Sequence, residues 1–346
     1  MHIGIPKETK IAEKRVALTP KACEELVQAG HTVHIEATAG EAAGFPDEAY
    51  TKVGVTIQPT AANLYGAAEM IVKVKEPQKG DLDLLTKDHL LFCYLHLAAE
   101  PDLTAALQSI GLTAVAFETV EKDGKTPLLA PMSAVAGRLA VQLGTWFLHA
   151  PRGGRGLLMG GIDGMQDGRV TVIGGGISGT EAAHLAYQMG AHVTLLDINE
   201  NRLTELKTQY PRMELVKSTP ENISEALKRT DLLVGSVYVV GKRAPHVVTE
   251  EQVKLMPEGS VIVDISIDQG GCVATSRPCT HEMPVYTLHG VTHSAITNLP
   301  GAVPRTSSLA LSTAILPYVH KLAKGEWDDA LTKGVNVQGG ELKIAL

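Results

Sequence analysis

The chain has 346 residues, of which 44% are hydrophobic and 20% are charged, a balance typical of a globular protein with about two domains. Its net charge of −7 disfavours a nucleic-acid-binding surface. The start of the chain lacks the apolar region of a signal peptide, and no apolar run approaches the length of a membrane span. The four cysteines show no metal-ligand spacing. We therefore expect a cytoplasmic protein with no metal site, membrane segment or nucleic-acid partner.

The first 130 residues alternate short apolar runs with helix-compatible segments. Strands are expected at His2–Pro6, Thr32–Ile35, Val55–Ile57, Met70–Val74, Leu90–Leu95 and Thr113–Phe117. Helices are expected after the caps Thr19 and Asp47, and at Ala61–Ala68 and Pro101–Ile110. This alternation predicts an α/β domain with a doubly wound parallel sheet.

Four polar residues lie at or beyond the carboxyl ends of these strands or in the loops: Arg15, Lys75, His96 and Glu118. Each alone has an ordinary explanation, such as a surface ion pair, a solvated lysine or a loop histidine with satisfied hydrogen bonds. Ligands of open α/β sheets bind outside the carboxyl ends of the strands. The joint placement of these residues therefore predicts a ligand site at one edge of the sheet.

A long helix is expected from Ser133 to His149. It connects the strand–helix alternation of the first 130 residues to a second alternation of strands and helices. Ser133 is a natural N-cap there, and the N-terminus of a helix attracts phosphate. The glycine-rich stretch that follows this helix is interpreted as an interdomain loop.

The middle of the chain carries a dinucleotide-binding fingerprint. A β-branched run is followed by Gly174, Gly176 and Gly179 at the G-x-G-x-x-G spacing and then by a helix-compatible segment. The next apolar strand ends in Asp197, which can accept hydrogen bonds from the adenine ribose and would repel a 2′-phosphate. NAD is therefore predicted rather than NADP, with Arg202 along the adenosine or in solvent. The alternative is a glycine-rich turn that binds nothing.

The second pattern continues to the end of the chain. Helices are expected after Asn199, Thr219 and the capping box Thr249–Gln252, strands at Leu232–Val234, Val261–Ile265 and Val285–Leu288, and a last helix at Ser307–Ala323. Asp268 follows one of these strands. It is interpreted either as a site residue or as a buried carboxylate that caps a helix.

Several long motifs in this chain resemble the L-alanine dehydrogenase family. They are Ile3–Lys10, Glu13–Ala17, Lys73–Pro77, Leu95–Ala99, Phe117–Thr119, Ala130–Arg138, Leu157–Gly161, the glycine fingerprint, Val263–Cys272, Ser276–Pro278 and Asn298–Ser307. The resemblance spans almost the whole chain. The segment His293–Thr297 departs from it, because the family more often has Tyr-Cys-Val-Ala there.

The resemblance implies an NAD-dependent enzyme that interconverts L-alanine with pyruvate and ammonium in a cytosolic homohexamer. It also implies two doubly wound, Rossmann-like domains with parallel sheets and a cleft between them. Residues 1–130 and 306–346 would form a discontinuous substrate domain, and residues 131–305 the NAD-binding domain.

The resemblance also assigns roles to residues. Arg15 and Lys75 would hold the substrate carboxylate, and His96 and Asp268 would be catalytic. The implied cofactor contacts are Ser133, Gly174, Gly176, Ile177, Gly179, Asp197, Arg202, Ser218, Val237, Tyr238, Ile265, Ser266, Ile267, Asp268, Arg277, Ile296, Thr297, Asn298 and Leu299.

Other classes of protein share parts of this pattern. One alternative is an NAD-dependent dehydrogenase for another small amino acid, or a saccharopine-type dehydrogenase. A second is a transhydrogenase-type NAD(H)-binding subunit, and a third is a non-catalytic NAD-responsive protein. An enzyme that makes alanine would need pyruvate and ammonium together to oxidise NADH, whereas a binding subunit would bind NADH without that chemistry.

Overall fold

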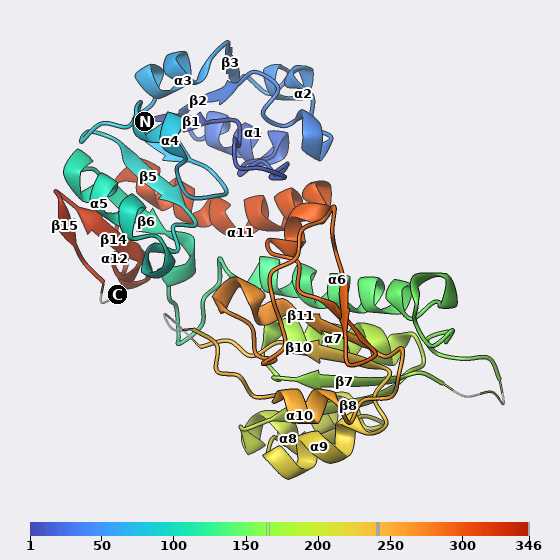
Figure 1. The fold of residues 1–346 in the computed structure, drawn as a ribbon. Helices are drawn as coiled ribbons and strands as arrows, with labels where there is room; N and C mark the ends of the chain where they lie inside the picture. The colour runs from blue at the N-terminus through green and yellow to red at the C-terminus, as the bar shows by residue number, and fades with distance from the viewer. Residues whose placement is uncertain (164, 166, 240–242, 345–346) are drawn as a thin grey trace. The chain divides into compact units, whose positions relative to one another are not determined.

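The computed structural model of the chain describes residues 1–163, 165, 167–239 and 243–344. The chain divides into two compact units, shown in Figure 1: Met1–Met132 with Gly301–Leu346, and Ser133–Pro300. Residues 345 and 346, at the end of the first unit, lie outside the described residues. The predicted α/β class is confirmed, because each unit has one twisted sheet with helices and mostly parallel strands.

The sheet of the first unit has the order β15-β14-β6-β5-β4-β1-β2-β3. Its strands are β1 (His2–Ile5), β2 (Thr32–Glu36), β3 (Thr56–Gln58), β4 (Met70–Val72), β5 (Leu90–Cys93), β6 (Thr113–Ala116), β14 (Val335–Gln338) and β15 (Glu341–Leu342). Its helices are α1 (Pro20–Gln28), α2 (Asp47–Thr51), α3 (Ala61–Ala67), α4 (Lys79–Leu82), α5 (Pro101–Ile110), α11 (Pro304–Lys324) and α12 (Asp329–Gly334). Helix α11 returns from the end of the chain to pack against α1 (Figure 1).

The sheet of the second unit has the order β12-β13-β11-β10-β7-β8-β9. Its strands are β7 (Arg169–Ile173), β8 (His192–Asp197), β9 (Glu214–Lys217), β10 (Leu232–Gly235), β11 (Val261–Asp264), β12 (Tyr286–Leu288) and β13 (Val291–Ser294). Its helices are α7 (Ile177–Gln188), α8 (Glu200–Gln209), α9 (Pro220–Leu227) and α10 (Glu250–Val253). Helix α6 (Ala130–Phe147) crosses the boundary between the two units in the sequence.

The sheets are mostly parallel, as expected, with antiparallel strands only at the edges of their described parts. β14 runs antiparallel to β6 and to β15, and β12 runs antiparallel to β13. Strand β13 was not expected, although it pairs parallel with β11 and completes the row of parallel strands. Strands β14 and β15 were not expected either. These short strands lie near the sheet edges, where the apolar pattern in the sequence is weakest.

Both faces of each central sheet are buried, as expected for a doubly wound fold. In β4, Met70 and Val72 belong to one apolar cluster and Ile71 to the other. In β10, Leu232 and Leu233 are divided between two clusters in the same way. This explains why the strands read as continuous apolar runs rather than as alternating patterns.

Three predicted helix caps are present. The side chains of Asn199 and Thr219 accept backbone N–H groups at the starts of α8 and α9, and Thr249 forms a reciprocal capping box with Gln252.

Two predicted caps are wrong because the side chains form hydrogen bonds with residues outside the helix. The Thr19 hydroxyl lies 3.2 Å from Ser312 Oγ and does not cap α1. Asp47 is the first residue of α2, and its carboxylate accepts the Thr38 N–H at 3.0 Å.

Candidate functional site

In the first unit, the four predicted polar residues follow four adjacent parallel strands. Arg15 lies in the loop after β1, Lys75 after β4, His96 after β5 and Glu118 after β6. The chain proceeds from β1 to β2 and β3 on one side of the sheet, and then returns to β4 on the other side of β1. The loops of Arg15 and Lys75 therefore flank a topological switch point, which is where open α/β sheets bind ligands.

Arg15 is a buried cation that pairs with the carboxylate of Glu13. Its Nε and Nη2 donate to the two carboxylate oxygens of Glu13 at 2.6 and 2.5 Å, and its Nη1 contacts Met132 Sδ at 3.1 Å. Burial disfavours the charged guanidinium, but the hydrogen bonds and charge of Glu13 more than offset this and raise the pKa of Arg15. The ordinary interpretation as a surface ion pair is wrong, since both side chains are almost fully buried.

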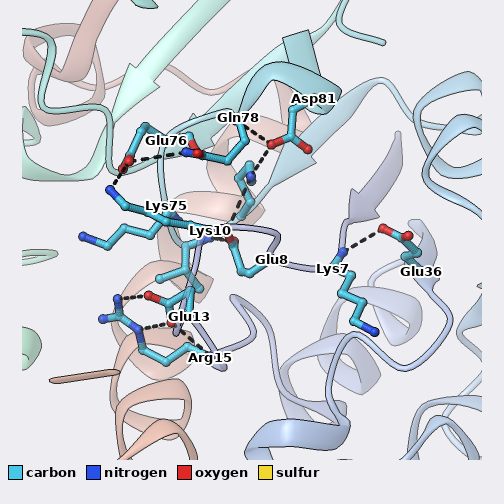
Figure 2. Close-up of polar contacts among 12 residues, drawn as sticks. Lys7, Glu8, Lys10, Glu13, Arg15, Glu36, Lys75, Glu76, Gln78 and Asp81 are labelled. Carbon is cyan, nitrogen blue, oxygen red and sulfur yellow. Dashed lines mark hydrogen bonds and ion pairs between the residues drawn. The ribbon is translucent and has the colours of Figure 1, made fainter. Parts of the chain in front are cut away.

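Lys75 lies in a turn that is fixed by contacts with carboxylates. Glu8 accepts the N–H of Val74 at 2.5 Å and makes a long contact of 3.4 Å with the N–H of Lys75. Glu76 pairs with Lys10. Burial raises the pKa of Glu76, but the hydrogen bond from Lys10 and the charge of Lys75 lower it overall. Figure 2 shows the Lys75 and Arg15 side chains extending to the same side from their two loops.

His96 has a strained backbone held by a neighbouring carboxylate. Its φ of 51° is left-handed, which costs roughly 1–3 kcal/mol for a residue other than glycine. Glu118 accepts the N–H groups of His96 and Leu95 at 2.6 and 3.1 Å. The imidazole is 44% exposed and stacks on Tyr94 with ring centroids 5.8 Å apart. Strain of this kind concentrates at functional sites, and here it presents an accessible imidazole at the sheet edge.

In the second unit, most of the expected cofactor contacts also follow the carboxyl ends of parallel strands. The glycine turn follows β7, Asp197 ends β8, Ser218 follows β9, Val237 and Tyr238 follow β10, Ile265, Ser266, Ile267 and Asp268 follow β11, and Ile296, Thr297, Asn298 and Leu299 follow β13. These six strands are neighbours in the sheet, and the switch point lies between β7 and β10. The structure therefore brings residues from six separated sequence segments to one edge.

The glycine turn has the spatial properties that the fingerprint predicts. A Cβ on Gly179 would lie 1.8 Å from the Gly174 carbonyl oxygen, so any side chain would force the turn away from α7. A Cβ on Gly176 would meet no atom within 4 Å. The backbone at Gly176 is thus open, and α7 begins at Ile177 directly behind it. A helix N-terminus beside open backbone fits a pyrophosphate group.

Asp197 and Arg202 both hold the glycine turn. The Asp197 carboxylate accepts the N–H groups of Gly175 and Asn199 at 2.5 and 2.7 Å. Arg202 donates to the Gly175 carbonyl at 2.9 Å and to the Thr180 hydroxyl at 3.0 Å. Arg202 therefore lies against the turn and also pairs with the exposed Glu205 at 2.9 Å, and its expected place along the adenosine stays a prediction.

Ser133 is not an N-cap. Helix α6 begins at Ala130, so Ser133 lies inside its first turns. The reason is that Ala130, Pro131 and Met132 continue the helix backward, and proline is well tolerated in a first turn. The expected N-cap geometry at Ser133 is therefore wrong, and its role as a phosphate contact stays a prediction.

Asp264 is a buried carboxylate that organises the loop after β11. It accepts the N–H groups of Ser266, Cys272 and Val273 at 3.0, 2.9 and 3.1 Å. Asp268, four residues later, is exposed and accepts the N–H of Asn298 at 3.1 Å. The buried capping carboxylate of this loop is thus Asp264, and the interpretation of Asp268 as such a cap is wrong.

In the segment that departs from the family pattern, His293 packs on the same tyrosine ring as Arg277. The buried His293 ring stacks on Tyr286 with centroids 5.0 Å apart, and its Nε2 lies 2.8 Å from Thr275 Oγ1. The Arg277 guanidinium lies 4.0 Å from the centroid of the same Tyr286 ring. Burial lowers the pKa of His293, so the imidazole is neutral near pH 7.

The carboxylates that hold these side chains were not expected from the sequence. Glu13, Glu8 and Asp264 make the contacts described above, but none was assigned a role. Their closeness in sequence to Arg15 and Asp268 was the available signal, since a buried cation or a bent loop needs an acceptor.

The described part of the chain shows no group of His, Cys, Asp and Glu side chains that could hold a metal ion. Across the same residues, every helix is too short or too polar to cross a membrane.

Comparisons with known proteins agree across the whole chain. Residues 4–136 match the N-terminal domain of the alanine dehydrogenase/PNT family, and residues 140–344 match its C-terminal domain. Alanine dehydrogenase of Halomonas elongata is 47% identical over 99% of this chain and 94% of its own length. That of Bacillus subtilis is 46% identical over 99% of this chain and 92% of its own length.

Solved structures extend this similarity to the fold. A structure of L-alanine dehydrogenase superimposes with a TM-score of 0.95 at 50% identity, covering 99% of this chain and 97% of the other. A transhydrogenase from Sinorhizobium meliloti superimposes with a TM-score of 0.85 at 22% identity, covering 99% of each chain. The second match shows a shared fold only.

Replacing Gly176 with alanine tests the glycine turn. The added methyl group meets no protein atom, so we expect an unchanged melting temperature. NADH affinity, measured by fluorescence titration, should fall at least tenfold if the methyl group occupies the space expected for the pyrophosphate. Gly66→Ala is the matched control, since its Cβ also meets no atom within 4 Å. Equal NADH affinities for the two variants would contradict the assignment.

Proposed function

The chain belongs to the alanine dehydrogenase/PNT family, and we propose that it catalyses the reversible, NAD-dependent oxidative deamination of L-alanine to pyruvate and ammonium. The observation that carries this proposal is the identity of 46–47% over 99% of the chain to two alanine dehydrogenases. The polar residues at the switch point of the first unit support it independently, because they supply two cations and an imidazole for a small oxo acid.

Arg15 and Lys75 hold the substrate carboxylate in this proposal. Charge-assisted hydrogen bonds from a guanidinium and an ammonium suit a carboxylate, and Glu13 fixes the plane of the guanidinium before substrate binds. Rigid positioning of this kind supplies much of the rate enhancement in reactions between two bound molecules.

His96 acts as the general acid and base. An imidazole gains and loses a proton near neutral pH, so it can transfer a proton to and from the substrate oxygen. Glu118 supports this role by holding the backbone N–H of His96 at 2.6 Å. Asp268, in the second unit, orients the water or ammonia and assists its proton transfer.

The second unit would hold NAD, and the bound cofactor would supply hydride transfer to and from the substrate Cα. The open backbone at Gly176 would take the pyrophosphate, and Asp197 the adenine ribose. Ser133, Ser218, Tyr238 and Arg277 would contact the rest of the cofactor, as the family resemblance implies. The first unit would then be the substrate domain.

We further propose that the enzyme is a cytoplasmic homohexamer, as the family resemblance implies. Analytical ultracentrifugation gives the oligomeric state directly, and a monomeric or dimeric mass would contradict this part of the proposal.

His96→Ala tests the proton-transfer role. We expect turnover with pyruvate, ammonium and NADH to fall at least ~100-fold, the typical contribution of a general acid or base. NADH affinity should remain unchanged because His96 belongs to the first unit. Near-normal turnover would remove His96 from the mechanism. His149→Ala, in the second unit, serves as the control and should keep wild-type turnover.

Asp197→Ala tests cofactor selection. Removing the carboxylate should improve the NADPH/NADH ratio of kcat/KM by at least tenfold, since a 2′-phosphate is no longer repelled. The glycine turn also loses an acceptor, so NADH affinity should fall. Glu200→Gln removes a nearby exposed carboxylate that pairs with Lys217, and this control should leave the ratio unchanged. An unaltered ratio in Asp197→Ala would contradict the ribose assignment.

A further inference from the structure

A second lysine lies beneath the turn that carries Lys75. Lys73 follows the last residue of β4, and its side chain is fully buried. Burying an ammonium group is unfavourable in free energy unless the group is paired. The partners of Lys73 therefore indicate which segments it connects. Those partners lie in two separate segments of the first unit.

The first partner is Asp81, whose carboxylate closes the turn at its far end. Its Oδ2 accepts Lys73 Nζ at 2.7 Å and the N–H of Gln78 at 2.8 Å. Its Oδ1 accepts the hydroxyl of the buried Tyr65 at 2.8 Å. Asp81 thus fixes residues 73 and 78, on either side of Lys75.

The second partner is Glu8, which belongs to the loop of Arg15. Its Oε2 lies 3.5 Å from Lys73 Nζ, and its Oε1 accepts the N–H of Val74. Figure 2 shows the Glu8 and Asp81 carboxylates beside the turn of Lys75. Lys73 therefore joins the loop that carries Arg15 to the turn that carries Lys75.

The charge of Lys73 is kept in this environment. Burial disfavours the ammonium, but the negative charges of Glu8 and Asp81 more than offset this and raise the pKa of Lys73. Burial also raises the pKa of Glu8, although the charge of Lys73 opposes this shift. By contrast, Lys79 on α4 pairs with Asp83 at 3.7 Å while its side chain is 92% exposed.

We propose that Lys73 is a positioning residue for the substrate carboxylate, which acts by holding the backbone of Lys75 at a fixed position relative to the loop of Arg15. This inference rests on the proposed function and adds a residue to it. Lys73 itself is buried below the turn and does not contact the substrate. Its removal should weaken binding of pyruvate through Lys75, without affecting NADH.

The test is a double-mutant cycle with Lys73→Met and Lys75→Ala. In the wild-type background, Lys73→Met should raise the KM for pyruvate at least tenfold, with the NADH dissociation constant unchanged within twofold. In the Lys75→Ala background, the same change should raise the KM less than twofold, because the group that Lys73 positions is already gone. Lys79→Met is the matched control and should keep the wild-type KM.

Two results would overturn the inference. One is a pyruvate KM within twofold of wild type for Lys73→Met, measured well below its melting temperature. The other is an equal rise in KM in both backgrounds, which would show that Lys73 only stabilises the fold.

If Lys73→Met does not fold, Glu8→Gln replaces it in the cycle. This variant keeps the acceptor for Val74 but weakens the contact with Lys73. We expect at least a threefold rise in KM that vanishes without Lys75, and no rise would contradict the inference.

The wild-type assay separates this inference from the proposed function. If wild-type protein does not oxidise NADH with pyruvate and ammonium, the proposed function fails and this inference fails with it. If wild type is active and the cycle is additive, only the role of Lys73 is wrong.

Discussion

Parallel strands bring their carboxyl ends to one edge of a sheet, and the proposed sites in both units depend on that constraint. In the first unit, β1, β4, β5 and β6 place Arg15, Lys75, His96 and Glu118 along a single edge. In the second unit, six neighbouring parallel strands place the glycine turn and most of the other expected cofactor contacts along another edge. Each edge includes a topological switch point, where the loops of adjacent strands turn apart and leave room for a ligand.

Charged side chains at such an edge need oppositely charged groups to fix their positions. The structure provides these groups as buried ion pairs. Glu13 orients Arg15, and Lys73 links Asp81 to Glu8 below Lys75. Buried ion pairs of this kind contribute little net stability, because desolvation opposes the attraction between the charges. In the proposed mechanism their value is positional, since they would fix the two cations before substrate binds. The second unit uses Asp264 and Asp197 similarly, although their partners are backbone N–H groups rather than cations.

Much of this arrangement could be predicted from the sequence, because the apolar runs and glycine spacing are local signals. The β7-turn-α7 unit, the end of β8 at Asp197 and the position of His96 shortly after β5 are examples. Three features could not be predicted. Ser133 lies inside α6 because the helix extends backward through Pro131. Strand β14 pairs antiparallel with β6 across more than 200 residues of chain, a contact that no local pattern indicates. The Glu8–Lys73 contact depends on the folding of two distant segments against each other.

The most direct test of this account is the oxidation of NADH by the purified protein, followed by its absorbance, with pyruvate in the presence and absence of ammonium. We predict oxidation that requires pyruvate and ammonium together, and much slower oxidation when 2-oxoglutarate replaces pyruvate. NADH binding without any oxidation in the presence of both substrates would contradict the proposed reaction while leaving the cofactor site intact.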